Sequence, residues 1–280
     1  MKTILLPVER NDLIESSLTT ATLLARIFDG YIEGFALGAD INPLIATEAM
    51  SPIVVYPADL TRQDQLTAEE SQKLFEDGMA ARGIPAVASG NEGPSYGWCD
   101  RPLSGDSFAG SRGRVFDVTI VGRPGTAAAS PHMSTLETAL FESGRPILIA
   151  PPEAPAKLGE TITIAWNGST ETARAIAFAM PVLKRAKRVV VLVIEGAGVP
   201  GPSGEDVARY IQRHGVECEA MAVARGSRNP GAAMLEEAIA AGSDLMVKGA
   251  YTQSRLRQMI FGGATSHIIA ETTIPVLMAH

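Results

Sequence analysis

The chain has 280 residues, of which 46% are hydrophobic and 20% charged, and its formal net charge is −7. This length suits one large domain or two of ordinary size, and the acidic balance disfavours nucleic acid and anionic membranes as partners, since both favour basic surfaces. No apolar stretch approaches the roughly 20 residues of a membrane span. With no signal peptide and only Cys99 and Cys218, we expect a cytoplasmic protein with reduced thiols.

The first half of the chain opens with an apolar strand, residues 3–9, and an amphipathic helix. Apolar residues at the spacing of helix turns predict the helix over residues 14–28, with Asp12 as its N-cap and Gly30 after its end. Residues 39–64 have no counterpart in the second half, and their three prolines predict an irregular excursion. A lid, a dimer contact and a hairpin-like wrap are equally consistent with this insertion.

An internal repeat divides the chain into two similar halves. Residues 117–122 (DVTIVG) and 244–249 (DLMVKG) both begin with Asp, continue with apolar residues and end at Gly. Between the halves, the proline-rich residues 151–159 are typical of a short extended spacer. We therefore expect two domains, residues 1–151 with the insertion and residues 160–280.

Strands and helices alternate along the second half. Most of its strands are continuous apolar runs, as expected when helices cover both faces of a parallel sheet. We expect strands at 161–166, 188–194, 217–224, 244–248 and 275–279, separated by helices at 170–186, 204–214, 231–242 and 263–272. Pro181 should kink or shorten the first of these helices. This alternation predicts a doubly wound α/β sheet, which binds ligands beyond the carboxyl ends of its strands.

The residues of these strands and turns resemble the universal stress protein family over nearly the whole chain. The second half carries the resemblance in TITIAWNGSTETARAI (161–176), RVVVLVIE (188–195), DLMVKGAY (244–251), GGATSHII (262–269) and PVLMAH (275–280). The first half carries it in DVTIVGRPG (117–125) and ETALFESGRPILIAP (137–151). The resemblance implies two tandem, doubly wound, Rossmann-like parallel sheets of five strands in the order 3-2-1-4-5. It also implies a role in stress resistance or survival.

In that strand order, the last strand of each unit lies at an edge of its sheet. Residues 146–150 and 275–279 are apolar edges without an internal charge, and nothing on such an edge repels a second strand. Members of the family are similar in dimerising through the equivalent strand. We therefore expect the two edges to pair antiparallel within one chain, as a pseudo-dimer, with a homodimer of two chains as the alternative.

A glycine-containing loop after residue 248 is the candidate nucleotide site. Nucleotide-binding members of the family resemble one another in a loop G-x-x-G, nine residues, then G-S or G-T, whose backbone N–H groups approach phosphate oxygens. Here Gly249 and Gly262 are in place, Thr252 replaces the second glycine, and Gly263 replaces the hydroxyl residue. Asn167 stands where the family has an acidic residue facing the nucleoside.

The resemblance implies that ATP or another adenine nucleotide would bind in the second half. Arg255 and Arg257 would add positive charge there. The expected contacts are Ala165, Trp166, Asn167, Val193, Gly249, Gly262, Gly263, Ala264 and Thr265. An equally consistent interpretation is that Gly249 only ends a strand, that the later glycines let the chain turn into the last helix, and that the arginines face water.

The first half departs from the nucleotide-binding pattern in a different way. Gly122 and Gly125 are kept, but Thr135 occupies the later glycine position and Glu9 replaces the usual Asp. We therefore expect any nucleotide in the second half only.

Three functional classes are consistent with these features. The first is a regulatory protein that senses or buffers an adenine nucleotide, and the second is a nucleotide-independent interaction or scaffold protein with degenerate clefts. A weak ATPase is disfavoured, because no positioned base or nucleophile is evident; we assign no catalytic residue and expect no metal site. Trp166 either lines the nucleoside pocket or packs beside the last helix. Cys218 is expected in the core, whereas Cys99 is either an inert packed thiol or a redox-reactive one.

Overall fold

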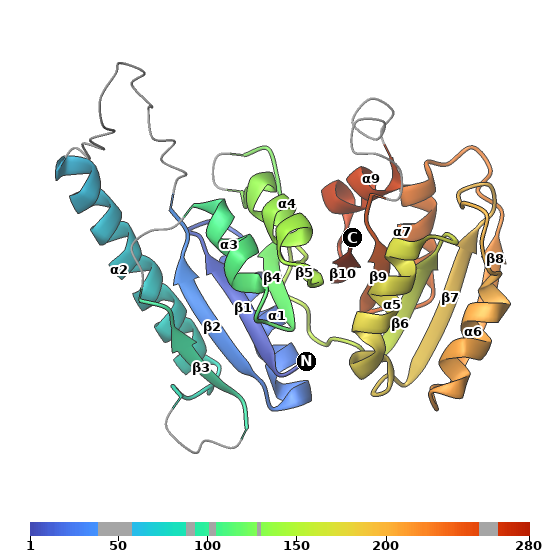
Figure 1. Cartoon of the computed structure of the whole chain (residues 1–280), viewed down its shortest axis with the longest axis horizontal. Helices are drawn as coiled ribbons and strands as arrows, with labels where there is room; N and C mark the ends of the chain where they lie inside the picture. The colour runs from blue at the N-terminus through green and yellow to red at the C-terminus, as the bar shows by residue number, and fades with distance from the viewer. Residues whose placement is uncertain (39–57, 88–92, 101–104, 128–129, 252–262) are drawn as a thin grey trace, which may run out of the picture.

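The computed structural model describes residues 1–38, 58–87, 93–100, 105–127, 130–251 and 263–280. Figure 1 shows two α/β halves side by side. The elements of the first half are β1 Thr3–Val8, α1 Ile14–Phe28, β2 Tyr31–Ala36, α2 Ala58–Ala81, β3 Ser95–Trp98, α3 Asp106–Gly113, β4 Val118–Gly122, α4 Met133–Glu142 and β5 Ile147–Ala150. Those of the second are β6 Thr161–Trp166, α5 Thr170–Leu183, β7 Arg188–Ile194, α6 Gly204–Arg213, β8 Cys218–Val223, α7 Pro230–Ala240, β9 Leu245–Gly249, α9 Ala264–Glu271 and β10 Val276–Ala279.

One ten-stranded sheet runs through both halves in the order β3-β2-β1-β4-β5-β10-β9-β6-β7-β8. Within each half the strands pair in parallel and repeat the order 3-2-1-4-5, as expected. The halves join where β5 and β10 pair antiparallel, with Leu148 opposite Leu277. The antiparallel pairing of the two apolar edges, predicted from the sequence, is therefore confirmed.

Helices cover both faces of this sheet and divide the core into two layers. On one face, buried side chains of α1, α2, α5 and α6 pack on alternate residues of the strands. On the other face, α4, α7 and α9 form a second cluster with the intervening residues, and α3 packs on Leu5 and Phe35. The continuous apolar runs of the central strands follow from this double coverage.

Helix α1 begins and ends through local backbone contacts. Its buried stripe confirms the predicted helix, but the prediction of Asp12 as N-cap is wrong. Leu13 is the N-cap residue and makes no side-chain cap. The side chain that forms the turn before the helix is that of Asn11, the residue before Asp12, whose Oδ1 accepts the N–H of Leu13 at 2.9 Å. At the other end Asp29 is left-handed (φ 49°), and the N–H of Gly30 donates to the carbonyl of Ala25.

One of two expectations about irregular backbone is corrected. Residues 58–64, assigned to the irregular insertion, lie in α2, while residues 39–57 lie outside the described residues. All three prolines of the insertion precede residue 58, and proline does not prevent a helix from starting just after it. Helix α5 runs through Pro181 and ends at Leu183, three residues before residue 186, so the expectation that this helix is kinked or shortened is confirmed as a shortening.

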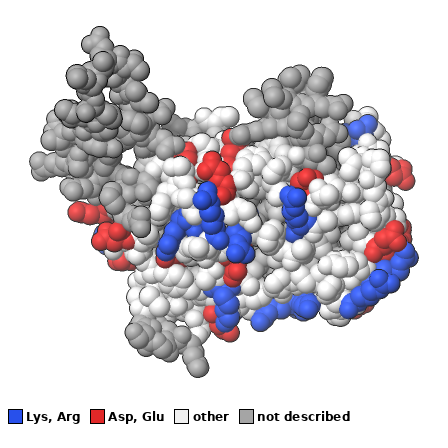
Figure 2. All heavy atoms as spheres, viewed as in Figure 1, with Lys and Arg blue, Asp and Glu red and all other residues white. Residues whose placement is uncertain are grey.

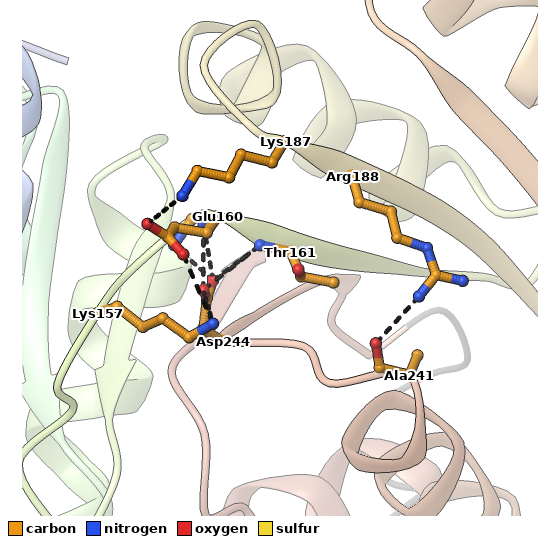
Figure 3. Close-up of polar contacts among 8 residues, drawn as sticks. Lys157, Glu160, Thr161, Lys187, Arg188, Ala241 and Asp244 are labelled. Atoms are coloured by element: carbon orange, nitrogen blue, oxygen red, sulfur yellow. Dashed lines mark hydrogen bonds and ion pairs between the residues drawn. The ribbon is translucent and has the colours of Figure 1, made fainter.

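The aspartates that open the two repeated segments anchor the first strand of each half. Asp244 Oδ1 accepts the N–H groups of Gly159 (2.7 Å) and Glu160 (2.9 Å), and Lys157 Nζ lies 3.5 Å from its other oxygen (Figure 3). In the first half, the carboxylate of Asp117 accepts the N–H of Thr3 at 3.1 Å. The repeated Asp therefore has a structural role at the amino ends of the strands, away from the candidate site.

Candidate functional site

A lysine lies buried at the carboxyl end of β9, where doubly wound sheets bind ligands. Lys248 is 4% exposed, and its Nζ donates to the carbonyl of Gly249 (2.7 Å) and to Thr265 Oγ1 (3.0 Å) in the first turn of α9. Successive side chains of β9 point to opposite faces of the sheet. Leu245 and Val247 belong to the α5/α6 face, whereas Met246 belongs to the α7/α9 face, so Lys248, two residues after Met246, lies on the α7/α9 face. Lys248, Gly263, Ala264 and Thr265 are called the Lys248 site below.

The charge of Lys248 has no counter-charge among the described carboxylates. Burial lowers the pKa of its ammonium group from 10.5 to about 8, and no neighbouring charge contributes to this shift. Both hydrogen-bond acceptors are neutral oxygens. Helix α9 adds a positive end, because Gly263 is its N-cap and supplies no side-chain acceptor to the first-turn N–H groups. The Lys248 site is therefore electropositive and short of acceptors.

Gly249 has a packing role on the opposite face of the sheet. A Cβ at this position would lie 2.3 Å from the backbone nitrogen of Thr172, so only glycine allows α5 to approach β9 this closely. The N–H of Gly249 donates to Thr172 Oγ1 at 3.3 Å, and that hydroxyl donates to Asn167 Oδ1 at 2.6 Å. Two of the expected ligand contacts, Gly249 and Asn167, thus take part in the hydrogen bonds that join β9, α5 and the end of β6.

The other expected contacts divide between the two faces. Trp166 and Val193 are paired in register and belong to the α5/α6 face, where Trp166 Nε1 donates to the carbonyl of Pro202 at 2.8 Å. The expectation that Trp166 packs beside the last helix is wrong, because α9 covers the other face. Ala165 lies on that other face and is paired with Lys248. Gly262, Arg255 and Arg257 lie outside the described residues.

The corresponding end of the first half is acidic. Thr135 Oγ1 lies 2.9 Å from Glu9 Oε1 and 2.6 Å from Asp106 Oδ1. A hydroxyl has one proton, so both contacts are hydrogen bonds only when one carboxyl is protonated. Burial raises the pKa of Glu9, and the Asp106 charge raises it further, while Thr135 and His132 oppose the shift. A cavity of about 10 Å³ beside Glu9 has room for about one water molecule.

The sequence interpretation missed two of the residues that set the charge of these sites. Lys248 is the one charged residue within the apolar run 245–249, and that signal was visible in the sequence. Asp106 is far from Glu9 along the chain, and only the packing of α3 against α4 brings it to Thr135.

The core thiol Cys218 and the face of the molecule in Figure 2 provide no second candidate site. Cys218 is buried, and burial raises its pKa to about 11, so it is an unreactive core thiol. The described residues hold no group of three or more His, Cys, Asp or Glu side chains suited to a metal ion. Within the same residues, no helix combines the length and the apolar character needed to span a bilayer. Figure 2 shows Lys and Arg interspersed with Asp and Glu on the face that it presents.

Comparison with known proteins identifies the second half. Residues 160–280 match the model of the universal stress protein family. The second half is therefore a universal stress protein domain. Among curated protein sequences none matches the chain. The universal stress protein fold extends over the first half as well, since both halves share one strand order.

Two solved structures share the fold of this chain over nearly its whole length. A universal stress protein from Archaeoglobus fulgidus DSM 4304 is similar over 99% of this chain and 95% of its own, with a TM-score of 0.72 and 16% identity. A functionally unknown protein from Pseudomonas aeruginosa PAO1 is similar over 100% of this chain and 92% of its own, with a TM-score of 0.54 and 14% identity. A universal stress protein in complex with cAMP overlaps 43% of this chain and 98% of its own, with a TM-score of 0.32 and 16% identity.

Proposed function

We propose that this universal stress protein is a regulatory binding protein that holds an adenine nucleotide in its second half. One observation carries the proposal: the two halves place groups of opposite charge at the carboxyl ends of their strands, with the buried Lys248 at the end of β9 and the half-buried Glu9 just after β1. Lys248 and the uncapped start of α9 make the second site positive. Glu9 and Asp106 make the first site negative, which disfavours a phosphate there by like-charge repulsion.

The proposed contacts combine the sequence expectation with this geometry. The phosphate groups would lie at the Lys248 site, where backbone N–H groups of the α9 first turn lack a side-chain cap. The nucleoside would lie against Ala165, Asn167 and the end of β6. Gly262, together with Arg255 and Arg257, remains an expected contribution from the loop before α9.

A second candidate function is a nucleotide-independent interaction protein. The roles of Gly249 and Asn167 favour it, because both residues already serve the contact between β9 and α5. Under this alternative the glycine pattern reflects packing, and no nucleotide binds at millimolar concentration.

Calorimetry with ATP, ADP, AMP and adenosine distinguishes the two functions. We expect heat from the nucleotides with wild type and with Glu9→Gln, because Glu9 lies in the half that is not used. Mass spectrometry of the small molecules released from the purified, denatured protein provides an independent test. Absence of both binding heat and a released nucleotide would favour the interaction protein.

A further inference from the structure

An aromatic ring of the first half lies against the segment that follows β9 in the second half. Phe141, near the end of α4, has its ring centroid 5.3 Å from that of Tyr251 and 4.9 Å from that of His280, the C-terminal residue. The C-terminus lies at the junction of the halves (Figure 1). The antiparallel pairing of β5 with β10 explains the contact, because it brings the amino end of β5, where α4 ends, to the carboxyl end of β10.

Tyr251 has a backbone conformation that a tyrosine rarely adopts. Its φ is 57°, in the left-handed region, where a side chain crowds the backbone of any residue other than glycine. Among the described residues, the other non-glycine residue with positive φ is Asp29, which has the common role of a left-handed C-cap. Tyr251 ends no helix, and strain of this kind persists only where the surrounding structure maintains it. The contacts of Tyr251 therefore indicate what maintains it.

A weak hydrogen bond and ring packing restrain Tyr251. Its N–H donates to Thr265 Oγ1 at 3.5 Å, the long limit of a hydrogen bond. Its ring packs on Phe141 and on the apolar cluster of the α7/α9 face. His280 adds an indirect contact, because its ring packs edge-on with Phe141 while its Nδ1 lies 3.1 Å from the carbonyl of Ala250. Phe141 therefore contacts Tyr251 directly and, through His280, the residue before it.

Tyr251 is connected to the Lys248 site through Thr265. The hydroxyl of Thr265 that accepts the N–H of Tyr251 also accepts Nζ of Lys248 at 3.0 Å. The first half contacts the other end of α9 as well, since Arg123 Nη1 donates to the carbonyl of Thr272, the C-cap residue, at 3.3 Å. A cation at this end stabilises a helix. Side chains of the first half thus act near both ends of α9.

We propose that the first half completes the site at the carboxyl end of β9, with Phe141 as a positioning residue that keeps Tyr251 in its left-handed conformation. Phe141 acts through Tyr251 and Thr265 rather than on the ligand itself. The two halves are then not independent modules, because their docking sets the geometry of the second-half site. The identity of the ligand rests on the proposed function, whereas the conformation of Tyr251 is measured without any ligand.

Nuclear magnetic resonance of the ligand-free protein gives the first test. The carbon chemical shifts of Tyr251 Cα and Cβ report its backbone conformation. We expect left-handed values in wild type and in Phe141→Tyr, which keeps the ring, and a change toward extended or right-handed values in Phe141→Ala. Unchanged Tyr251 shifts in Phe141→Ala would overturn the inference. If Phe141→Ala does not fold, Phe141→Leu removes the ring while keeping apolar volume, and the same comparison applies.

Phe108→Ala is the matched control for this substitution. Phe108 lies on α3 of the first half and makes an edge-on contact with Phe35, with 4.9 Å between the ring centroids. Its loss removes an aromatic contact of the same kind within the first half. It should destabilise the protein without changing the Tyr251 shifts or ADP binding.

Calorimetry with ADP gives the second test. If about a tenth of the Phe141→Ala molecules keep Tyr251 left-handed, the apparent affinity falls about tenfold, because only that fraction is competent to bind. Tyr251→Gly separates positioning from general destabilisation, since glycine adopts positive φ without strain. In that background Phe141→Ala should change the affinity by less than about twofold. A tenfold loss in both backgrounds would overturn the inference.

The two tests separate this inference from the proposed function. Equal ADP affinity in wild type and Phe141→Ala would refute the positioning role and leave the function intact. If wild type binds no nucleotide while the Tyr251 shifts still depend on Phe141, the adenine-nucleotide function is wrong and the positioning role is supported.

Discussion

Replacing Lys248 by methionine should stabilise the protein at neutral pH, although it deletes two hydrogen bonds. In the folded, ligand-free chain the pKa of Lys248 is about 8, and in the unfolded chain it returns to about 10.5. The unfolded state therefore holds the proton more tightly. By linkage, this difference costs about 3.4 kcal/mol of folding stability below pH 8, because one pKa unit corresponds to about 1.36 kcal/mol.

The sign of the pH dependence follows from the same difference. Between pH 8 and 10.5 the unfolded chain carries a proton that the folded chain lacks, so wild-type stability rises with pH across this window. The substitution also removes the donor to the Gly249 carbonyl and to Thr265 Oγ1, each worth about 1 kcal/mol. Near pH 7 the removed burial cost exceeds these losses, and the variant should be about 1 kcal/mol more stable. Near pH 10.5 it should be about 2 kcal/mol less stable, with equality near pH 9.

Urea denaturation at pH 7, 8, 9 and 10 measures this difference. The buried Trp166 lies in the same half as Lys248 and reports its unfolding by fluorescence. Other titrating groups affect both proteins equally and cancel in the comparison. Lys184→Met makes the same change of charge at an exposed position after α5 and controls for net charge. A stability difference that stays constant from pH 7 to pH 10 would refute a lowered Lys248 pKa.

Three further predictions concern the framework of the fold. Asp244→Ala should lower the free energy of unfolding by about 3 kcal/mol, and Asp117→Ala by less, because the Asp244 side chain is 8% exposed and that of Asp117 is 40% exposed; equal losses in urea titrations would contradict the anchoring role. Leu277→Lys places a charge in the buried β5–β10 contact and should lower the free energy of unfolding by about 3 to 5 kcal/mol, measured as a lower Tm. An unchanged Tm would mean that this pairing does not stabilise the chain. Proteolytic cleavage within residues 151–159 should leave two folded units, residues 1–151 and 160–280, and loss of the circular dichroism signal on cleavage would show that the halves do not fold separately.

The sequence by itself was sufficient for most of the architecture. Apolar runs of four to six residues predicted buried parallel strands, because only a sheet covered on both faces tolerates them. The repeat of 117–122 in 244–249 predicted two units, and the absence of charge from both last strands predicted their pairing. These features are local or periodic, so they can be read along the chain.

The tertiary structure alone decided the roles of individual polar residues. The repeat of the aspartate could be recognised in the sequence. The N–H groups that bind Asp244, however, belong to residues more than 80 positions away in sequence. Gly249 suited a phosphate loop and a packing contact equally well until α5 was placed against it. The charge of Lys248 acquires its meaning from burial without a carboxylate partner, and that of Glu9 from the approach of Asp106. Desolvation and the interactions between charges depend on distances in the folded structure. A pattern along the sequence does not contain those distances.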